Sequence, residues 1–339
     1  MKRFLLLALA VLVIVVVAVY AAFQFSPWPS ASLIRRSFQK EAARVSRELE
    51  KHVPHDISAQ MNEHYDPADR DAYLDVFYPS SGNTSQGLAT VVWVHGGAWI
   101  SGTKQDVANY SKVLASRGFT VVGVDYSVAP AKIYPTPVRQ VNTALSYLVK
   151  NSRRLHVNPS QFYLAGDSGG SHITAQLANV VTVPSYSQAL GITPSIQPSQ
   201  LRGLVLFCGA YDTRRVHLDG PFGSFLKTVL WSYSGGKNFA HDPFFATASV
   251  IDYVTSDFPP AFISVGNADP LEEQSHAFAD ALVSRGVRVD TLFFPKDYSP
   301  PLPHEYQFNL DTDAGKLAFE RTVKFLSQPV ALKFPIAGG

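Results

Sequence analysis

The segment GDSGG at residues 166–170 places a serine, Ser168, in a pattern typical of catalytic nucleophiles. The segment fits G-x-S-x-G, in which the serine lies on a sharp turn between a strand and a helix. The apolar run Phe162–Ala165 before it predicts a strand, and the pattern from Ser171 to Val180 predicts a helix. Small neighbours allow the close backbone approach of such a turn, and the helix N-terminus favours developing negative charge. We therefore predict that Ser168 is a nucleophile, rather than a serine that only caps a helix.

The same five letters resemble the nucleophile segment of trypsin-like proteases, but three features of the chain argue against that class. Trypsin-like proteases are all-β proteins that place His and Asp before the serine in the chain. They usually carry several disulfides, whereas this chain has one cysteine, Cys208. In addition, the residues after Ser168 have a helical pattern, which that class lacks at this point.

Backbone donors for a developing oxyanion are predicted in the segment HGGAW at residues 95–99, which follows an apolar strand pattern. Acyl transfer needs N–H groups at about 2.7–3.1 Å from the oxyanion, and glycines let the backbone turn its amides toward that oxygen. A His-Gly-Gly segment in this place is the form that lipases and esterases use. We assign the donors to Gly96 and Gly97, with Gly169 as the third; a plain turn at a strand end is the alternative. His95 precedes the serine and is expected to be a structural hydrogen-bonding residue.

The general base and its orienting acid are expected after the serine, in the order Ser, Asp, His. His304 lies in the loop after the last predicted strand, whereas His172 lies within the helix that directly follows the serine. Asp269 lies in the loop after the preceding strand, and Asp297, in the last loop, is the alternative acid. In this arrangement His304 takes the proton of the serine, and Asp269 holds the imidazole in the required tautomer.

Strand and helix patterns alternate from Ala72 onward, which predicts a mostly parallel sheet with helices on both faces. The predicted strands are 73–78, 90–95, 120–125, 161–165, 204–208, 261–265 and 289–294. The predicted helices are 107–117, 137–150, 171–180, 272–285 and 314–326, and a polar turn is predicted at 82–87. Two stretches break the alternation, 183–200 and the aromatic stretch 211–258. We interpret the second as a cap over the active site, with an ordinary surface excursion as the alternative.

Five motifs together make the chain resemble the hormone-sensitive-lipase-like esterases, the α/β-hydrolase fold-3 group of microbial carboxylesterases. They are HGGAW at 95–99, DYSVAP at 125–130, YPTP at 134–137, GDSGG at 166–170 and DPLEE at 269–273. The resemblance covers roughly Tyr73 to Leu326. It implies an α/β-hydrolase fold, with a mostly parallel eight-stranded sheet flanked by helices, and a cap built from the N-terminal segment and an insertion near 211–258. It also implies hydrolysis of short- to medium-chain carboxylic esters, a small-molecule ester substrate, and no metal or organic cofactor.

The chain departs from the usual pattern of this family at several positions. Ala98 stands where a third glycine is usual, Gly169 where an alanine is usual, and Ser127 where an arginine is usual. The usual His-Gly-Phe around the base is HEY at residues 304–306. These differences favour the feruloyl-esterase, acyl-peptidase and kynurenine-formamidase-like branches, so an amidase or peptidase on the same triad stays an alternative. A non-catalytic binding protein is a further alternative, but it predicts the loss of a triad residue or of the glycines, and none is lost.

The first 25 residues are predicted to form a transmembrane signal-anchor. The apolar run Phe4–Phe23 spans roughly 30 Å as a helix, the thickness of a hydrocarbon core. Lys2 and Arg3 favour a cytoplasmic N-terminus, which places the catalytic domain outside the cytoplasm on the membrane. The basic residues beyond the apolar run weaken this orientation: Arg35, Arg36, Lys40 and Arg44. Signal cleavage near residues 19–21, followed by secretion, is the alternative.

Residues 26–60 are predicted to be a linker with a possible cap helix, followed by a catalytic domain at 61–330. The segment FSPWPSAS at 25–32 is typical of a linker, and 37–52 has a helical pattern. The net charge is +2 without a long run of Lys or Arg, so nucleic acid is not an expected partner. The single cysteine excludes a disulfide within the chain and argues against a thiolate metal site.

Overall fold

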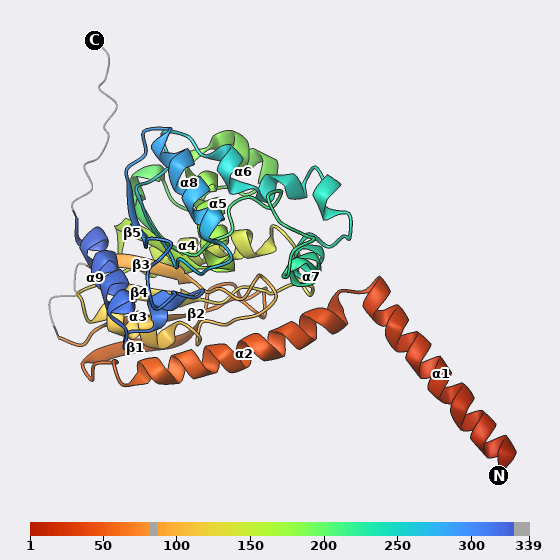
Figure 1. The fold of residues 1–339 in the computed structure, drawn as a ribbon. Coiled ribbons are helices and arrows are strands. Elements are labelled where there is room, and N and C mark those ends of the chain that lie inside the picture. Colours follow the sequence, from red (N-terminus) through yellow and green to blue (C-terminus); the bar gives the residue numbers. More distant parts are fainter. Residues whose placement is uncertain (82–86, 329–339) are drawn as a thin grey trace.

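The core of the protein is an eight-stranded, mostly parallel sheet (Figure 1). The computed structural model describes residues 1–81 and 87–328, so most of the turn predicted at 82–87 lies outside the described residues. The strand order is β1-β2-β4-β3-β5-β6-β7-β8, and only the pairs β1·β2 and β2·β4 are antiparallel. The strands are β1 (Ile57–His64), β2 (Tyr73–Pro79), β3 (Leu88–Val94), β4 (Thr120–Val124), β5 (Val157–Asp167), β6 (Leu201–Phe207), β7 (Ala261–Val265) and β8 (Val289–Phe293).

Seven of these strands were predicted, but β1 was not. Strands β3 to β7 form near-continuous apolar runs because both of their faces are covered, which makes them visible in the sequence. Strand β1 lies at the sheet edge, and its residues, ISAQMNEH, are only half-buried or exposed. The sheet therefore begins at Ile57, and the predicted domain start at residue 61 is a few residues late.

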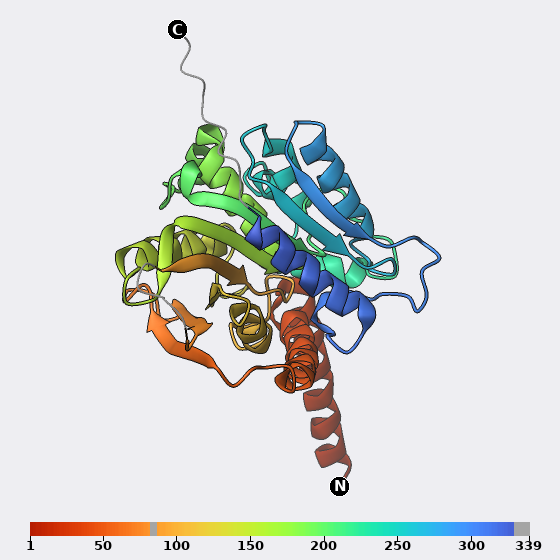
Figure 2. The ribbon, with the colours of Figure 1, turned by 90° about the vertical axis from the view of Figure 1, so that its left-hand side faces the viewer.

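Helices cover both faces of the sheet (Figure 2). Successive residues of β3 point to opposite faces, with Val92 in one apolar core and Trp93 in the other. The first core takes in Leu145 of α4 and Ile173 of α5, whereas the second takes in Phe319 of α9. The helices of this layered domain are α3 (Ala108–Ala115), α4 (Thr136–Lys150), α5 (Gly169–Thr182), α6 (Pro184–Leu190), α8 (Glu272–Val283) and α9 (Asp313–Ser327).

The aromatic stretch 211–258 folds into helix α7 (Gly223–Ser234) and three short 3-10 turns. Tyr233 and Phe245 are buried, their rings lie 6.0 Å apart, and both belong to the apolar core that covers one face of the sheet. Phe225 of α7 contacts Phe38 of the N-terminal helix α2, with ring centroids 5.9 Å apart. The segment is thus folded and packs against α2.

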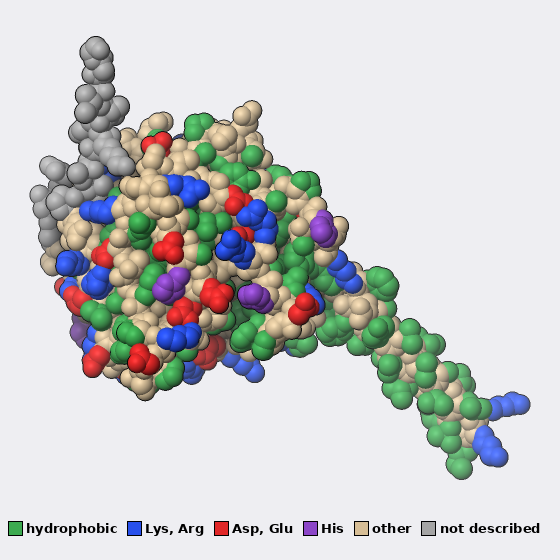
Figure 3. Space-filling view, turned by 45° about the horizontal axis from the view of Figure 1, so that its top comes forward, with side chains coloured by type: hydrophobic (Ala, Val, Ile, Leu, Met, Phe, Trp, Pro, Cys, Tyr) green, Lys and Arg blue, Asp and Glu red, His purple; other side chains and the backbone are tan. Residues whose placement is uncertain are grey.

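Two long helices precede the sheet. The most apolar 18-residue stretch of helix α1 (Lys2–Phe25) has a mean hydropathy of 3.2, and the helix has no buried residue, so it is long and apolar enough to cross a membrane. Figure 3 shows hydrophobic side chains along its whole length, with basic side chains at its tip. Helix α2 (Trp28–Glu50) begins two residues after α1 ends. The prediction of a linker over residues 25–32 is therefore wrong except at Ser26 and Pro27. The proline in the first turn of α2 does not interrupt the helix, because an N–H at that position would have no hydrogen-bond partner within the helix.

Candidate active site

Ser168 lies on the turn that connects β5 to α5, at the carboxyl end of the parallel strands. Its backbone has φ 50° and ψ −120°, a strained conformation for a residue with a Cβ, and its N–H donates to the Phe207 carbonyl at 2.8 Å. The turn requires a residue without a side chain at Gly170, because a Cβ there would lie 2.0 Å from the Val94 carbonyl oxygen. The glycines around the serine therefore allow helix α5 to start directly against β3.

His304 and Asp269 lie in hydrogen-bonded contact with Ser168. The Nε2 atom of His304 is 3.0 Å from the Ser168 Oγ, and the Nδ1 atom is 2.8 Å from the Asp269 Oδ2. The Asp269 side chain is fully buried after β7, and its Oδ1 accepts from the Leu271 N–H at 2.7 Å. The alternative acid, Asp297, is exposed, and the described part of the chain shows no hydrogen bond between it and His304. The three predicted residues are thus brought together as a chain of two hydrogen bonds.

The protonation of His304 depends on its neighbours. Burial lowers the pKa of the imidazole, but Cys208, the hydrogen bond to Asp269 and the Glu305 carboxylate raise it, and the raised pKa prevails. Burial raises the pKa of the Cys208 thiol to about 12, so this thiol is neutral near neutral pH. The two carboxylates consequently account for the stabilisation of the imidazolium.

The side chains of Cys208, Asp269 and His304 also form the kind of cluster that can hold a metal ion. One ligand atom from each lies within 4.8 Å of the others. However, the thiol is neutral, and both ring nitrogens of His304 already face Asp269 and Ser168. The donor set therefore fits a proton relay and does not fit a metal site, which needs a thiolate and a free ring nitrogen.

The loop after β3 approaches the nucleophile from the other side. Gly97, Ala98 and Trp99 all have positive φ, and a Cβ on Gly169 would lie 3.4 Å from the Ala98 nitrogen. Among the described residues, the N–H groups of Gly97 and Ala98 have no hydrogen-bond acceptor. The Gly96 N–H, in contrast, interacts with the Asp167 carboxylate and lowers its pKa. The Ala98 nitrogen thus lies beside the serine turn, whereas the N–H of the predicted donor Gly96 faces the Asp167 carboxylate.

Two histidines with structural roles hold this loop in place. His95 is buried and stacked on Tyr126, and its Nδ1 lies 2.9 Å from the Gly96 oxygen, in keeping with its expected structural role. His172, at the start of α5, accepts from the Trp99 Nε1 at 3.1 Å, and its Nε2 lies 2.7 Å from the Ala248 carbonyl. Burial lowers the pKa of His172 to about 4, so the ring is neutral and can accept this bond. His172 therefore links the loop to the cap segment.

A pair of carboxyl groups beside the serine was not predicted. Asp167 is fully buried, and its Oδ1 accepts from the Trp93 Nε1 at 2.8 Å. Burial raises the pKa of Asp167 well above its ordinary value, and the neighbouring Glu305 carboxyl raises it further. The Oε1 atom of Glu305 lies 3.7 Å from the His304 Nε2. Burial and the neighbouring carboxyl thus favour the protonated form of Asp167 next to the reacting atoms.

The only signal for this pair in the sequence is the HEY segment, where a glycine usually follows the base. Glu305 has φ 60°, in the left-handed region, which explains why glycine is the common residue at this position. The contact with Asp167 joins two loops that are far apart in the chain, and no local pattern reports such a contact.

We expect the substitution Asp167→Asn to reduce the loss of stability that the wild-type protein shows as pH rises. The folded pKa of Asp167 is above its unfolded pKa of about 3.9, so folding takes up a proton. The stabilisation is complete below pH of about 4 and is lost as pH rises through the raised pKa, by at most about 1.4 kcal/mol per pH unit. The neutral amide removes this contribution. Urea unfolding at pH 5 and pH 8 measures it, and an equal drop in both proteins would contradict the raised pKa of Asp167.

A large cavity opens above the serine. Its volume is about 1500 Å³, and its walls come from α2, the loop after β3, residues 215–229 of the cap and the His304 loop. The apolar wall residues include Phe38, Val45, Val216, Leu218 and Phe225. This volume exceeds the 300–1000 Å³ that is usual for small-molecule sites.

Comparisons with known proteins agree with this geometry. Residues 74–282 match the protein family described as BD-FAE. An esterase from Gibberella moniliformis is 27% identical over 260 residues, which cover 72% of this chain and 76% of the relative. The carboxylesterase NlhH from Mycobacterium tuberculosis is 30% identical over 210 residues, which cover 60% of this chain and 63% of the relative. The chain thus spans less than two thirds of that relative's length.

Solved structures share the fold. Esterase B from Lactobacillus rhamnosis superimposes with a TM-score of 0.74 at 22% identity, over 89% of this chain and 96% of that one. An esterase from Pyrobaculum calidifontis gives a TM-score of 0.69 at 23% identity, over 89% and 94% of the two chains. The sheet and helices described above are therefore those of the α/β-hydrolase fold, as predicted. Because the family match extends over well more than half of the sequence, this chain belongs to the BD-FAE family of α/β-hydrolase esterases.

Proposed function

We propose that the protein is a serine carboxylesterase that forms an acyl-enzyme on Ser168. The observation that carries this proposal is the pair of hydrogen bonds from the Ser168 Oγ to His304, at 3.0 Å, and from His304 to Asp269, at 2.8 Å. Similar proteins bear the names esterase and carboxylesterase, which supports an ester as the substrate.

The geometry supports a two-step acyl transfer. The His304 Nε2 takes the hydroxyl proton as the Ser168 Oγ attacks the carbonyl carbon, and the protonated imidazole then gives that proton to the leaving alcohol. In the second step His304 activates a water molecule that releases the acid. The buried Asp269 stabilises the imidazolium that forms in both steps.

We assign the stabilisation of the oxyanion to the N–H groups of Gly97, Ala98 and Gly169. This assignment retains Gly97 and Gly169 from the sequence-based prediction. Ala98 replaces Gly96, because the Gly96 N–H already interacts with the Asp167 carboxyl. Each such donor contributes about 10²–10³ in kcat in well-studied hydrolases. Alanine at position 98 is compatible with the role, because the donor is a backbone group.

The cavity walls support an apolar acyl or alcohol group of short to medium length. Ligand sites are mostly apolar with a few polar groups that fix orientation, and here Phe38, Val216 and Phe225 supply the apolar surface. The volume of about 1500 Å³ leaves room for a substituent larger than an acetyl group. A series of p-nitrophenyl esters of increasing acyl length would measure this preference.

A fluorophosphonate probe tests the proposed mechanism, because it reacts covalently with an activated serine. We expect the wild-type protein to be labelled and the Ser168→Ala variant to remain unlabelled. No labelling of the wild type, or equal labelling of both proteins, would refute the proposal. Rates on matched p-nitrophenyl ester and anilide substrates then distinguish an esterase from an amidase or peptidase on the same triad.

We further propose that α1 anchors the protein in a membrane, with the catalytic domain at 57–328 outside the cytoplasm. Support comes from the length, hydropathy and complete exposure of α1. Secretion after cleavage of α1 is the alternative, and the mass of the protein recovered from its source cell decides between the two. An anchored enzyme keeps the residues of α1, whereas a secreted one lacks them.

A further inference from the structure

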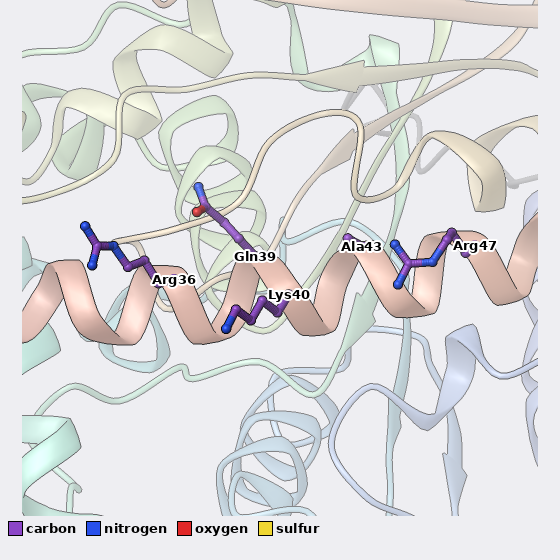
Figure 4. Close-up of a pocket in the computed structure, with 5 residues that line it drawn as sticks. All are labelled: Arg36, Gln39, Lys40, Ala43 and Arg47. Carbon is purple, nitrogen blue, oxygen red and sulfur yellow. The ribbon is translucent and has the colours of Figure 1, made fainter.

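Helix α2 has one face against the catalytic domain and one face away from it. Phe38, Ala42 and Val45 line the cavity above Ser168. The opposite face carries exposed basic side chains at intervals of four and seven residues, which place them on one side of the helix. Figure 4 shows this face with its basic residues and the small residue between them: Arg36, Lys40, Ala43 and Arg47.

The basic residues of this outer face take no part in holding the fold together. Within residues 1–81 and 87–328, Arg36, Lys40 and Arg47 make no ion pair and no side-chain hydrogen bond. Arg44 differs, because it binds Glu41 and Glu48 at 2.5 Å each. Arg35 also differs, because it donates to two backbone carbonyls of the catalytic domain. Three cations on one face are therefore available to an external anionic partner.

The position of α1 indicates what that partner is. Only Ser26 and Pro27 separate the apolar helix from α2, so the start of α2 lies at the surface of any membrane that α1 crosses. Figure 1 shows α1 leaving the domain at a steep angle to α2, and both views place α2 on the side of the domain nearest to α1. A membrane plane that crosses α1 consequently runs along the outer face of α2.

Contacts at the junction support this placement. Lys237 of the cap donates to the Gln24 carbonyl near the end of α1, and its ammonium lies 4.6 Å from the Trp231 ring centroid. Trp28 and Leu33 are 46% and 57% exposed near the start of α2. Exposed aromatic and apolar side chains beside a membrane-spanning helix are typical of the interface between lipid and water.

We propose that the outer face of α2 docks on an anionic lipid surface, with Arg36, Lys40 and Arg47 near the headgroup phosphates. This inference rests on the proposed anchoring by α1. A basic residue near an anionic bilayer strengthens contact about fivefold. Because the inner face of the same helix lines the cavity, docking holds the catalytic cavity beside the bilayer, where lipophilic esters concentrate.

The test uses full-length protein in lipid nanodiscs and a fluorescent thiol label at one of two exposed alanines. Ala43→Cys places the label on the outer face of α2, and Ala189→Cys places it on α6, which lies far from α2 in Figures 1 and 2. The native Cys208 is buried, so the label goes to the introduced cysteine. In discs with phosphatidylglycerol, a water-soluble quencher should reach the label at residue 43 several-fold more slowly than in neutral discs. The label at residue 189 should show no difference.

Charge removal provides the second arm of the test. The double substitution Arg36→Gln/Lys40→Gln should weaken docking on the order of 25-fold and restore quenching at residue 43. The control, Lys150→Gln/Arg153→Gln at the end of α4, removes the same charge and should leave the protection unchanged.

Equal quenching at residue 43 in anionic and neutral discs, or equal effects of the two double substitutions, would overturn the docking proposal. Failure of the protein to enter the discs would overturn it together with the anchoring by α1. Hydrolysis of a p-nitrophenyl ester by the same samples reports on the catalytic proposal separately, because a water-soluble ester does not require docking.

Discussion

Replacing Ser168 by alanine is expected to lower kcat/KM for a p-nitrophenyl ester by about six orders of magnitude. The substitution removes the Oγ atom that accepts the acyl group and leaves His304 without its partner at 3.0 Å. In a well-studied serine hydrolase the loss of the nucleophile alone costs about 2 × 10⁶ in kcat. Steady-state kinetics of purified protein measure this loss, and a decrease of less than about tenfold would show that another residue is the nucleophile.

A glycine at the same position separates catalysis from stability. With φ 50° and ψ −120°, Ser168 occupies a conformation that costs a residue with a Cβ about 1–3 kcal/mol. We expect Ser168→Gly to be as inactive as Ser168→Ala. Its free energy of unfolding should exceed that of Ser168→Ala by about 1 kcal/mol, because the relief of strain outweighs the greater loss of backbone entropy of glycine on folding. Urea unfolding of both variants measures the difference. A less stable glycine variant would contradict the strain that we infer at this turn.

The substitution Asp269→Asn is expected to lower kcat by about 10⁴-fold while leaving the fold intact. The asparagine is nearly isosteric, so its side-chain oxygen can still accept from the Leu271 N–H, as Asp269 does at 2.7 Å. Its amide group, however, favours the wrong imidazole tautomer, and it lacks the charge that stabilises the imidazolium. The corresponding change in a serine protease triad has an effect of this size.

The pH dependence of the Asp269→Asn variant gives a second readout. The carboxylate raises the pKa of His304, so its removal lowers that pKa, and the acidic limb of kcat/KM should move to lower pH. Asp297→Asn is the matched control, because Asp297 is exposed and was the alternative acid in the sequence. A large loss of activity in Asp297→Asn with normal activity in Asp269→Asn would reverse the assignment of the orienting acid.

The sequence by itself was sufficient to predict those features that depend on the local pattern of a single strand. Strands β3 to β7 are apolar because they are buried on both faces, and their pattern is therefore local. Parallel strands end at one edge of a sheet, so residues that follow them meet there. For this reason chain order and strand ends were enough to single out Ser168, Asp269 and His304, which the structure brings within hydrogen-bonding distance.

Features that depend on contacts between distant segments were decided by the tertiary structure. We propose Gly97 and Ala98 as the amides that face Ser168, because the buried Asp167 carboxyl interacts with the Gly96 N–H, and the sequence alone does not reveal this interaction. The raised pKa of Asp167 likewise arises only in the folded protein, where the carboxyl is buried and the loop that carries Glu305 meets it.

The N-terminal region shows the same division. Its hydropathy was sufficient to predict the length and apolar character of α1, because a helix without buried residues is described by its own side chains. The resemblance implied that the N-terminal segment contributes to a cap, but no local pattern determines the position of α2, because that position depends on Phe38 meeting Phe225, almost two hundred residues further along the chain. Local composition thus singled out the residues that we propose to carry the chemistry, and long-range packing decided which backbone groups lie near them and how α2 covers the cavity.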